Sequence, residues 1–166
     1  DEVREDKYGS VLDVGATATR LTRYVCRQGL LYRVSWSEHE EISAFSFTEK
    51  LEEFCKQYVL RRQKLSVEGH KANAKLRTAC VRAAKILAGG AAQADVEADA
   101  LVDGVDVRVR VTKARFDDMC SSLNSNLKEL IKDEPGEIIY AGGYYSNASE
   151  ELAAFGAAKQ ASLVDF

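Results

Sequence analysis

Short runs of hydrophobic residues in the first quarter of the chain predict three β-strands. These runs lie at residues 11–15, 21–26 and 30–36. The first run ends in a stretch of Gly, Ala and Thr, which favours a tight turn. Gln28-Gly29 lies between the other two runs and favours a hairpin turn, because glycine tolerates the positive backbone angles that such turns need.

A second hairpin is predicted by strict alternation of polar and apolar residues. Residues 94–101 and 105–111 both alternate, and Asp103-Gly104 between them is a strong turn signal. One face is predicted to be buried, and the residues expected on it are Ala94, Val96, Ala98, Ala100, Val105, Val107, Val109 and Val111.

Apolar residues spaced three and four apart predict four helices. The first begins with a capping box at residues 46–49 and ends near Arg61-Arg62, where positive charge suits the helix dipole. The second runs from about Lys71 to Leu87 and stops at Gly89-Gly90.

The third helix is capped by Thr112 and carries five apolar residues, namely Phe116, Met119, Leu123, Leu127 and Leu130. A short strand at residues 137–141 then leads into Gly142-Gly143. The last helix is predicted from Ser149 to Leu163, and its many Ala and Gly residues suit close packing against another backbone.

Composition and charge narrow the class of protein. The chain has 166 residues, of which 46% are hydrophobic and 30% charged, as expected for one ordinary folded domain. The net charge of −3 argues against nucleic-acid binding driven by overall charge. Four well-separated cysteines favour reduced thiols in a core over disulfides or zinc ligands. No apolar run is long enough to span a bilayer and no signal peptide is recognisable, so we expect no membrane association.

Residues 75–88 resemble the adenine-side helix of the DnaK-type 70-kDa heat-shock chaperones. In that family the segment reads roughly Leu-Arg-Thr-Ala-Cys-Glu-Arg-Ala-Lys-Arg-Thr-Leu-Ser. The frame is kept here, but Val81 replaces Glu, Ala84 replaces Lys, and Ala88 replaces Ser; Lys85, in place of Arg, keeps its charge. The resemblance therefore implies that most of the polar contacts to adenosine are lost and that nucleotide binding is weaker.

Further segments extend the resemblance over nearly the whole chain. Residues 101–106, 111–120, 138–143 and 155–158 are similar to family segments in the same order. The resemblance implies an α/β chain with the actin-like ATPase fold (ribonuclease H-like), forming the second lobe of a DnaK-type nucleotide-binding domain over residues 1–166. Residues of about 38–112 would be its upper subdomain and the rest its lower subdomain.

The end of the chain most resembles one branch of the family. Residues 151–163 are similar to the end of the nucleotide-binding domain in the Ssz-type subunit of the ribosome-associated complex. The connections near residues 132–137 and 145–149 are shorter than in the family, which has further elements after its Gly-Gly turn. We expect segments to be missing from the sequence at these two places.

The candidate nucleotide-binding residues follow from the family's glycine-rich turn and from its adenosine side. The turn is represented by Asp13-Val14-Gly15-Ala16-Thr17, in which one glycine of the frame survives and a Cβ at Ala16 would crowd a phosphate. Asp13 could approach a metal through water, but Asp13 and Thr17 are equally consistent with ordering a tight turn. The full candidate set for binding ATP or ADP, weakly and with Mg²⁺ only alongside the nucleotide, is Asp13, Gly15, Ala16, Thr17, Lys85, Gly142 and Gly143.

No catalytic residue is predicted. The family's first lobe, with its catalytic lysine and carboxylate, is absent from the sequence, so we expect no ATP hydrolysis by this chain alone. His39 and His70 are isolated in the sequence, so we expect each to be a surface or packing residue rather than a ligand or a catalytic base. The basic residues Arg61, Arg62, Lys64, Lys71 and Lys75 favour a solvent-facing surface over an RNA contact, so no direct nucleic-acid site is predicted.

The resemblance implies a non-hydrolysing co-chaperone. Such a protein would pair with a J-domain partner at the ribosome and act on nascent chains in the cytoplasm. Two alternatives stay open at this point. One is an ATP-driven chaperone of the family with a drifted site. The other is a structural or assembly subunit of a large complex, such as a mitochondrial ribosome.

Overall fold

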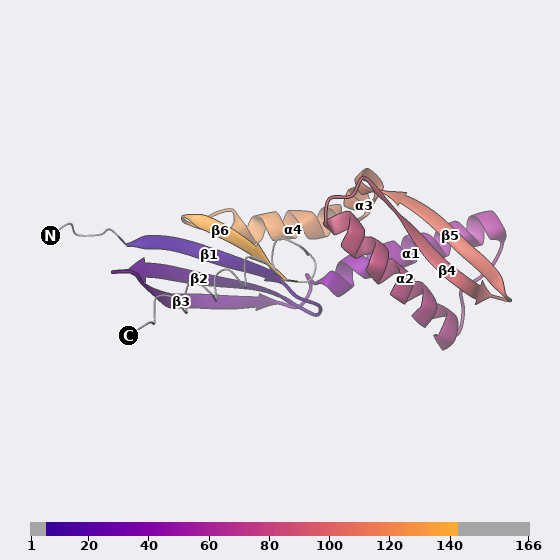
Figure 1. The fold of residues 1–166 in the computed structure, drawn as a ribbon, viewed down its shortest axis with the longest axis horizontal. Helices are drawn as coiled ribbons and strands as arrows, with labels where there is room; N and C mark the ends of the chain where they lie inside the picture. The colour runs from indigo at the N-terminus through magenta and orange to yellow at the C-terminus, as the bar shows by residue number, and fades with distance from the viewer. Residues whose placement is uncertain (1–5, 143–166) are drawn as a thin grey trace. The chain divides into compact units, whose positions relative to one another are not determined.

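The described chain divides into two compact units. The computed structural model describes residues 6–142. The first unit comprises residues 6–44 and 126–142, and the second comprises Phe45–Ser125 (Figure 1). The predicted limits of an upper subdomain, at about 38–112, stay a prediction.

Unit 1 is built on a four-stranded mixed sheet. Its strands are β1 (Lys7–Val14), β2 (Thr19–Arg27), β3 (Leu30–His39) and β6 (Glu137–Ala141), in the order β3-β2-β1-β6. The first three strands are antiparallel, whereas β6 pairs with β1 in parallel. All four predicted strands are therefore confirmed.

The turn between β2 and β3 matches its prediction in backbone geometry. Gln28 and Gly29 both have positive φ angles, of 51° and 83°. Two successive positive φ angles are the mark of the tight hairpin turns that match strand twist. One face of the sheet packs into the core of the unit. The buried apolar residues of this core are Leu12, Val14, Leu21, Val25, Ile42 and Leu127.

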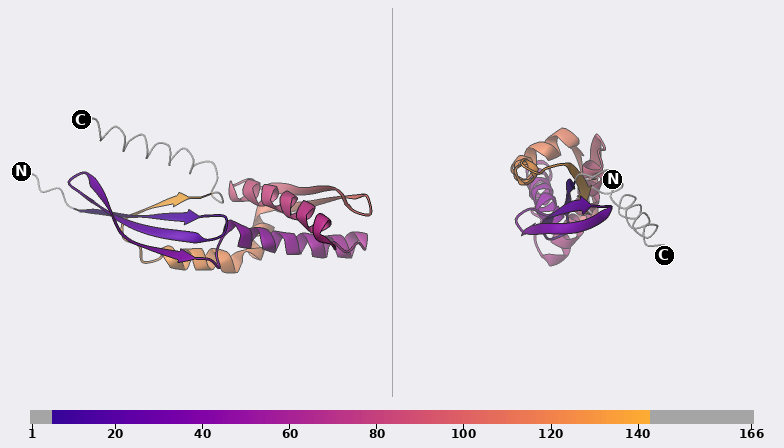
Figure 2. Two further views of the ribbon diagram at one scale, coloured as in Figure 1. Left: turned by 90° about the horizontal axis from the view of Figure 1, so that it is seen from below. Right: turned by 90° about the vertical axis from the view of Figure 1, so that its left-hand side faces the viewer.

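Unit 2 combines helices with a separate hairpin. Its elements are α1 (Ala44–Gln63, of which Ala44 is counted with unit 1), α2 (His70–Ala88), β4 (Gln93–Val102), β5 (Val105–Thr112), α3 (Lys113–Met119) and the start of α4 (Ser121–Ile131). Helix α2 packs against β4, and α1 runs behind α2 in Figure 1 and beneath it in the first view of Figure 2. Buried side chains from α1, α2, β4, β5 and α3 form its core, among them Phe47, Leu51, Leu76, Leu87, Val96, Val109 and Phe116.

The predicted start of the first helix is wrong by three residues, because a cap at Ser46 places the first helical residue at Phe47. Helix α1 begins at Ala44, whose backbone N–H donates to the carbonyl of Gly15 at 2.9 Å. Ser46 therefore lies inside the helix, where it cannot adopt the extended backbone of a capping residue. The second helix has the predicted extent, and Gly89 caps its end.

The alternation of the second hairpin is broken near its turn. The ladder shifts register between Ala98 and Val102, and Ala100 has a φ of 45°. The N–H of Ala100 donates to the Asp106 carboxylate at 2.7 Å, which holds this irregular backbone. As a result Ala100 is exposed and Leu101 is buried, which reverses the prediction for this position.

Thr112 caps the third helix as predicted, with its hydroxyl accepting a hydrogen bond from the N–H of Arg115 at 3.3 Å. The predicted single helix is in fact two. Cys120 separates α3 from α4 with φ −97° and ψ 12°, outside the α-helical range. Two serines follow Cys120, and serine competes with the helical backbone for hydrogen bonds.

The predicted last helix, residues 149–163, lies outside the described residues. Along residues 6–142, no helix combines the length and the hydrophobicity needed to cross a membrane.

Candidate functional site

The turn after β1 carries four of the candidate nucleotide-binding residues. Asp13 is half-buried near the end of the strand, whereas Ala16 and Thr17 are exposed at the tip of the turn. The N–H of Gly15 donates to the carbonyl of Ala18 at 3.0 Å, and a Cβ on Gly15 would lie only 2.9 Å from that oxygen. The chain's own turn therefore requires this glycine.

A second hydrogen bond fixes the far side of the same turn. The buried hydroxyl of Thr19 donates to the carbonyl of Ile42 at 2.7 Å. Together with the bond from Ala44 to Gly15, it ties the turn to the segment that enters α1. The turn is thus held by the body of unit 1 and presents Ala16 and Thr17 outward.

Gly142 comes to the same end of the sheet from β6. Asp13 and Ala141 are partners in the parallel ladder, so Gly142 follows directly beside Val14. Its φ is +99°, and a Cβ there would run into the carbonyl of Val14 and lie 2.5 Å from Oδ1 of Asp13. The structure therefore brings Asp13, Gly15 and Gly142 together, while Gly143 lies outside the described residues.

Close packing of the backbone explains why Gly15 and Gly142 are glycines, without any need for a bound ligand. Each prevents a collision between its own Cβ and a neighbouring backbone carbonyl. These glycines are consequently weak support for a phosphate site. Among the described residues no cluster of three or more His, Cys, Asp or Glu could hold a metal ion.

The adenosine-side positions lie on α2 in unit 2. Lys85 and Val81 are exposed on this helix, and Val81 retains 49% of its surface. Ala84 is only 3% exposed, because its side chain lies on the packed face of α2 beside Cys80 and Leu87. A position that the family resemblance associates with a polar contact is thus part of the hydrophobic core.

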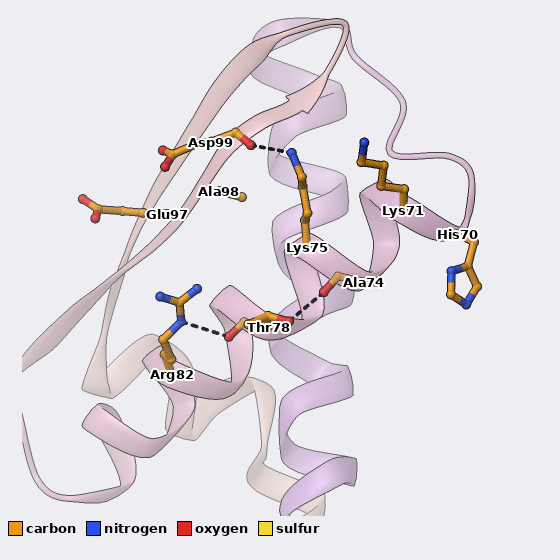
Figure 3. Close-up of a pocket in the computed structure, with 9 residues that line it drawn as sticks. All are labelled: His70, Lys71, Ala74, Lys75, Thr78, Arg82, Glu97, Ala98 and Asp99. Atoms are coloured by element: carbon orange, nitrogen blue, oxygen red, sulfur yellow. Dashed lines mark hydrogen bonds between the residues drawn. The ribbon is translucent and has the colours of Figure 1, made fainter.

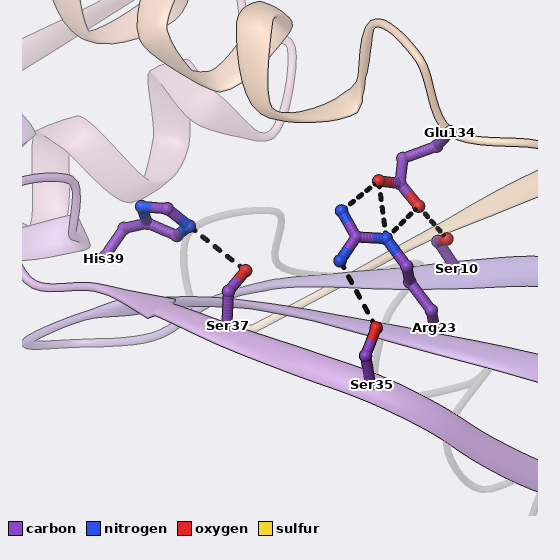
Figure 4. Close-up of polar contacts among 6 residues, drawn as sticks. All are labelled: Ser10, Arg23, Ser35, Ser37, His39 and Glu134. Carbon is purple, nitrogen blue, oxygen red and sulfur yellow. Dashed lines mark hydrogen bonds and ion pairs between the residues drawn. The ribbon is translucent and has the colours of Figure 1, made fainter.

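Unit 1 contains an ion pair with a buried carboxylate, which the sequence did not predict (Figure 4). Glu134 follows α4 in the chain, and its side chain is 5% exposed. The guanidinium of Arg23 donates from Nε to both of its oxygens, at 2.8 and 2.9 Å, and Ser10 donates to Oε2 at 2.6 Å. These residues are 111 and 124 positions away from Glu134 along the chain, so no local pattern could have predicted the cluster.

The cluster perturbs the acidity of its carboxyl group. The hydrogen bonds from Arg23 lower the pKa of Glu134, and their effect exceeds the opposing effect of burial. The ion pair holds the connection of residues 132–137 against the sheet. That connection is one of the two places where missing segments are predicted, and this prediction stays open.

The cysteines of unit 2 behave as core residues. Cys55, Cys80 and Cys120 are all fully buried. A hydrogen bond with Cys80, together with burial, raises the pKa of Cys55, and burial raises the pKa of Cys120 to about 12. Raised thiol pKa values disfavour the reactive thiolate.

A groove in unit 2 is the other candidate site (Figure 3). It lies between α2 and β4 and has a volume of about 760 Å³. Helix α2 contributes Lys71, Lys75 and Arg82, and β4 contributes Glu97 and Asp99. The sequence singled out Lys71 and Lys75 as part of a basic stretch, but not Arg82.

No protein-family model matches the chain. Known heat-shock proteins do match it. A heat shock cognate 70 kDa protein 3 from Dictyostelium discoideum is 37% identical over 94 residues, which are 50% of this chain and 15% of that protein. A heat shock 70 kDa protein from Neurospora crassa is 25% identical over 185 residues, covering 93% of this chain and 28% of its own length.

The human putative heat shock 70 kDa protein 7 is 35% identical over 83 residues, which are 44% of this chain and 22% of that protein. The chain therefore spans less than a third of the length of these relatives. Their matches bear on the family and not on the Ssz-type branch. The chain is thus similar in sequence to heat shock 70 kDa proteins. Its sheets and helices form the α/β fold of a partial actin-like ATPase lobe.

Proposed function

We propose that this chain is part of an atypical heat-shock 70-kDa protein that acts as a non-hydrolysing co-chaperone platform. In this proposal it resembles the Ssz-type subunit, pairs with a J-domain protein at the ribosome and supports the folding of nascent chains in the cytoplasm. Nucleotide, if bound, would have a structural role, and Mg²⁺ would accompany it.

The observation that carries the proposal is the apolar character of the adenosine side of α2. Val81, Ala84 and Ala88 stand where the family has charged or polar residues, and burial of Ala84 at 3% exposure gives this position a packing role. Each polar contact that a buried ligand loses weakens binding, typically by about 0.5–1.5 kcal/mol for a neutral hydrogen bond. Three lost contacts of this size would together lower nucleotide affinity by roughly one to three orders of magnitude.

Calorimetric titration of Mg²⁺–ATP into the protein tests the nucleotide part of the proposal. A useful variant restores the two positions outside the core, with Val81→Glu and Ala88→Ser in one protein. We expect the restored variant to bind nucleotide more tightly than the natural chain. Tight, magnesium-dependent binding with turnover by the natural protein would instead support an ATP-driven chaperone.

That alternative has one observation in its favour, namely the meeting of Asp13, Gly15 and Gly142 at one end of the sheet. Co-purification tests the partner. Recovery of a J-domain protein with cytoplasmic ribosomes would support the co-chaperone. Recovery of organellar ribosomal proteins without a J-domain partner would point to a structural subunit of a large assembly, such as a mitochondrial ribosome, and would contradict the proposal.

A further inference from the structure

Strand β3 forms one edge of the unit 1 sheet and is rich in apolar residues (Figure 1). It ends the strand order β3-β2-β1-β6, so among residues 6–142 no strand pairs with its other side. Edge strands of folded proteins commonly carry lysine or proline, or are covered, which prevents pairing with another chain. In residues 30–36 the one charged residue is Arg33, and the exposed apolar or aromatic residues are Leu30 (60%), Leu31 (59%), Tyr32 (49%), Val34 (60%) and Trp36 (56%).

The pairing of β3 with β2 fixes which side chains share a face of the sheet. Paired residues of an antiparallel ladder lie on the same face. Tyr32 pairs with the buried Val25, and Ser37 pairs with the buried Leu21. Tyr32 and Ser37 therefore lie on the core face of the sheet.

The opposite face of β3 carries one cation, one carboxylate and two apolar side chains. These residues are Leu31, Arg33, Trp36 and Glu38, and all four pair with even-numbered residues of β2, whereas its buried residues are odd-numbered. Val34 has no partner on β2, because the register shifts there. This bulge is the reason why Arg33 and Trp36, three positions apart, share a face.

We propose that two copies of this chain pair edge to edge through β3, antiparallel and related by two-fold symmetry. In the register that overlaps all ten residues, the first residue of one strand faces the last residue of the other. Tyr32 then faces Ser37 of the second copy, so core-face residues meet core-face residues. The extra residue Val34 of one copy is matched by the same residue of the other, so the bulge does not interrupt the new ladder.

The same register sets complementary groups against each other on the opposite face. Arg33 lies opposite Trp36 of the second copy, and a guanidinium is attracted to the face of a tryptophan ring. Glu38 of the second copy is the diagonal neighbour, within reach of a long side chain. Among residues 6–142 Arg33 has no ion-pair partner, whereas Glu38 bonds to Arg20 through Oε2 alone. Because the arrangement is symmetric, each contact occurs twice.

Neighbouring registers fit less well. A shift by one residue sets core-face residues against residues of the opposite face, which a continuous sheet does not allow. A shift by two leaves two residues of each strand without an opposite partner. The register with full overlap is thus also the one that gives Arg33 both an aromatic ring and a carboxylate.

A second copy suits this edge better than two other occupants. An uncharged apolar peptide would cover the apolar side chains but would offer no carboxylate to Arg33. A helix laid on one face would leave the edge N–H and C=O groups of β3 without a strand to pair with. At about 3.3 Å per residue the paired strands extend over roughly 33 Å. One strand pair is a small interface, so we expect a reversible dimer and not a permanent one.

The sequence predicted a strand here but not that the strand lies at an edge. The proposal does not use the co-chaperone role. Its test contains no ribosome, J-domain protein or nucleotide, so either proposal can fail while the other stands.

Sedimentation equilibrium over a broad range of protein concentration tests the proposal. We expect the natural chain to change from monomer to dimer and to stop at two copies. Val34→Lys should raise the dissociation constant at least about tenfold, because the two new cations would meet near the symmetry axis beside both Arg33 side chains. The matched control Val105→Lys makes the same change at a 40% exposed valine of unit 2 and should alter it less than about twofold. Circular dichroism checks that both variants fold.

Tryptophan fluorescence gives a readout at β3 itself. Trp36 is the chain's one tryptophan, and it is 56% exposed. As the protein concentration rises, we expect its emission to shift to shorter wavelength and its quenching by acrylamide to fall. Val34→Lys should remove this concentration dependence, and Val105→Lys should keep it.

Charge reversal tests the register. Arg33→Glu would bring a carboxylate beside Glu38 of the second copy and should raise the dissociation constant at least about tenfold. Arg33→Lys keeps the charge and should weaken the dimer by a smaller factor. Since Arg33 is exposed, neither change is expected to unfold the protein.

Four outcomes would overturn the proposal. A monomer with quenchable Trp36 at every concentration would leave the edge to a different partner. A monomer with Trp36 shielded at every concentration would show that another part of the same chain covers β3. Growth beyond two copies would indicate general apolar association. A dimer that neither Val34→Lys nor Arg33→Glu weakens would place the interface elsewhere.

Discussion

Replacement of Glu134 by Gln should destabilise the protein through the buried ion pair of unit 1. The carboxylate is 5% exposed and accepts hydrogen bonds from Arg23 and Ser10. Hydrogen bonds to charged groups contribute about 1.5–3 kcal/mol each, and breaking a fully buried pair costs about 3–5 kcal/mol. Because the Arg23 side chain is 40% exposed, solvent screens part of this energy, and we expect a loss of about 2–3 kcal/mol at neutral pH.

The effect should depend on pH with a definite sign. The Arg23 contacts hold the pKa of Glu134 below its unfolded value of about 4.3. The stabilisation is therefore fully present above about pH 4.3 and is lost as the pH falls through the folded-state pKa. Since Gln does not ionise, the difference between the two proteins should shrink over the same range.

Urea denaturation at neutral pH and at several acidic pH values measures this difference. Glu129→Gln is the matched control, because Glu129 makes a 3.4 Å pair with Lys132 while 73% exposed. This control should change the free energy of unfolding by less than about 0.5 kcal/mol. A Glu134→Gln effect no larger than that of the control, or one that persists unchanged in acid, would refute the role assigned to the ion pair.

Three further predictions concern backbone, capping and thiols. Gly142→Ala should lower the free energy of unfolding by more than about 1 kcal/mol, because φ is +99° and the new Cβ would collide with the Val14 carbonyl and with Asp13. The control Gly104→Ala, where a Cβ meets nothing within 4 Å, should lower it by about 1 kcal/mol or less in the same urea assay. Thr112→Ala should destabilise by about 1 kcal/mol through loss of the α3 cap, which thermal denaturation would detect; an unchanged midpoint would contradict the capping role. Iodoacetamide near pH 8 should alkylate the half-buried Cys26 first and spare the three buried thiols, as measured by mass spectrometry of the folded protein. Early labelling of Cys120 would contradict its burial and its raised pKa.

Local sequence patterns predicted most of the elements because each depends on neighbouring residues. Both hairpins were predictable because each turn, Gln28-Gly29 and Asp103-Gly104, contains a glycine that tolerates a positive φ. Thr112 caps α3 by bonding three residues ahead, which is also a local event. The start of α1 was not predictable, because a hydrogen bond between Ala44 and the distant Gly15 accompanies it.

The candidate nucleotide site illustrates the same limit. The sequence places Asp13 and Gly142 far apart, and the parallel pairing of β1 with β6 makes them neighbours. The sequence also does not show that Ala84 lies in the core. An alanine at this position is consistent both with the loss of a ligand contact and with packing of the helix face.

Sequence by itself determined the alternation of elements, the turns and the family resemblance, since periodicity and side-chain type are properties of short segments. Tertiary structure alone decided which distant groups meet. It paired Glu134 with Arg23 across 111 residues and brought the ammonium of Lys75 on α2 to the backbone carbonyls of Asp99 and Ala100. The physical reason is that an ion pair or a groove wall depends on how strands and helices pack, and packing joins residues that the chain keeps apart.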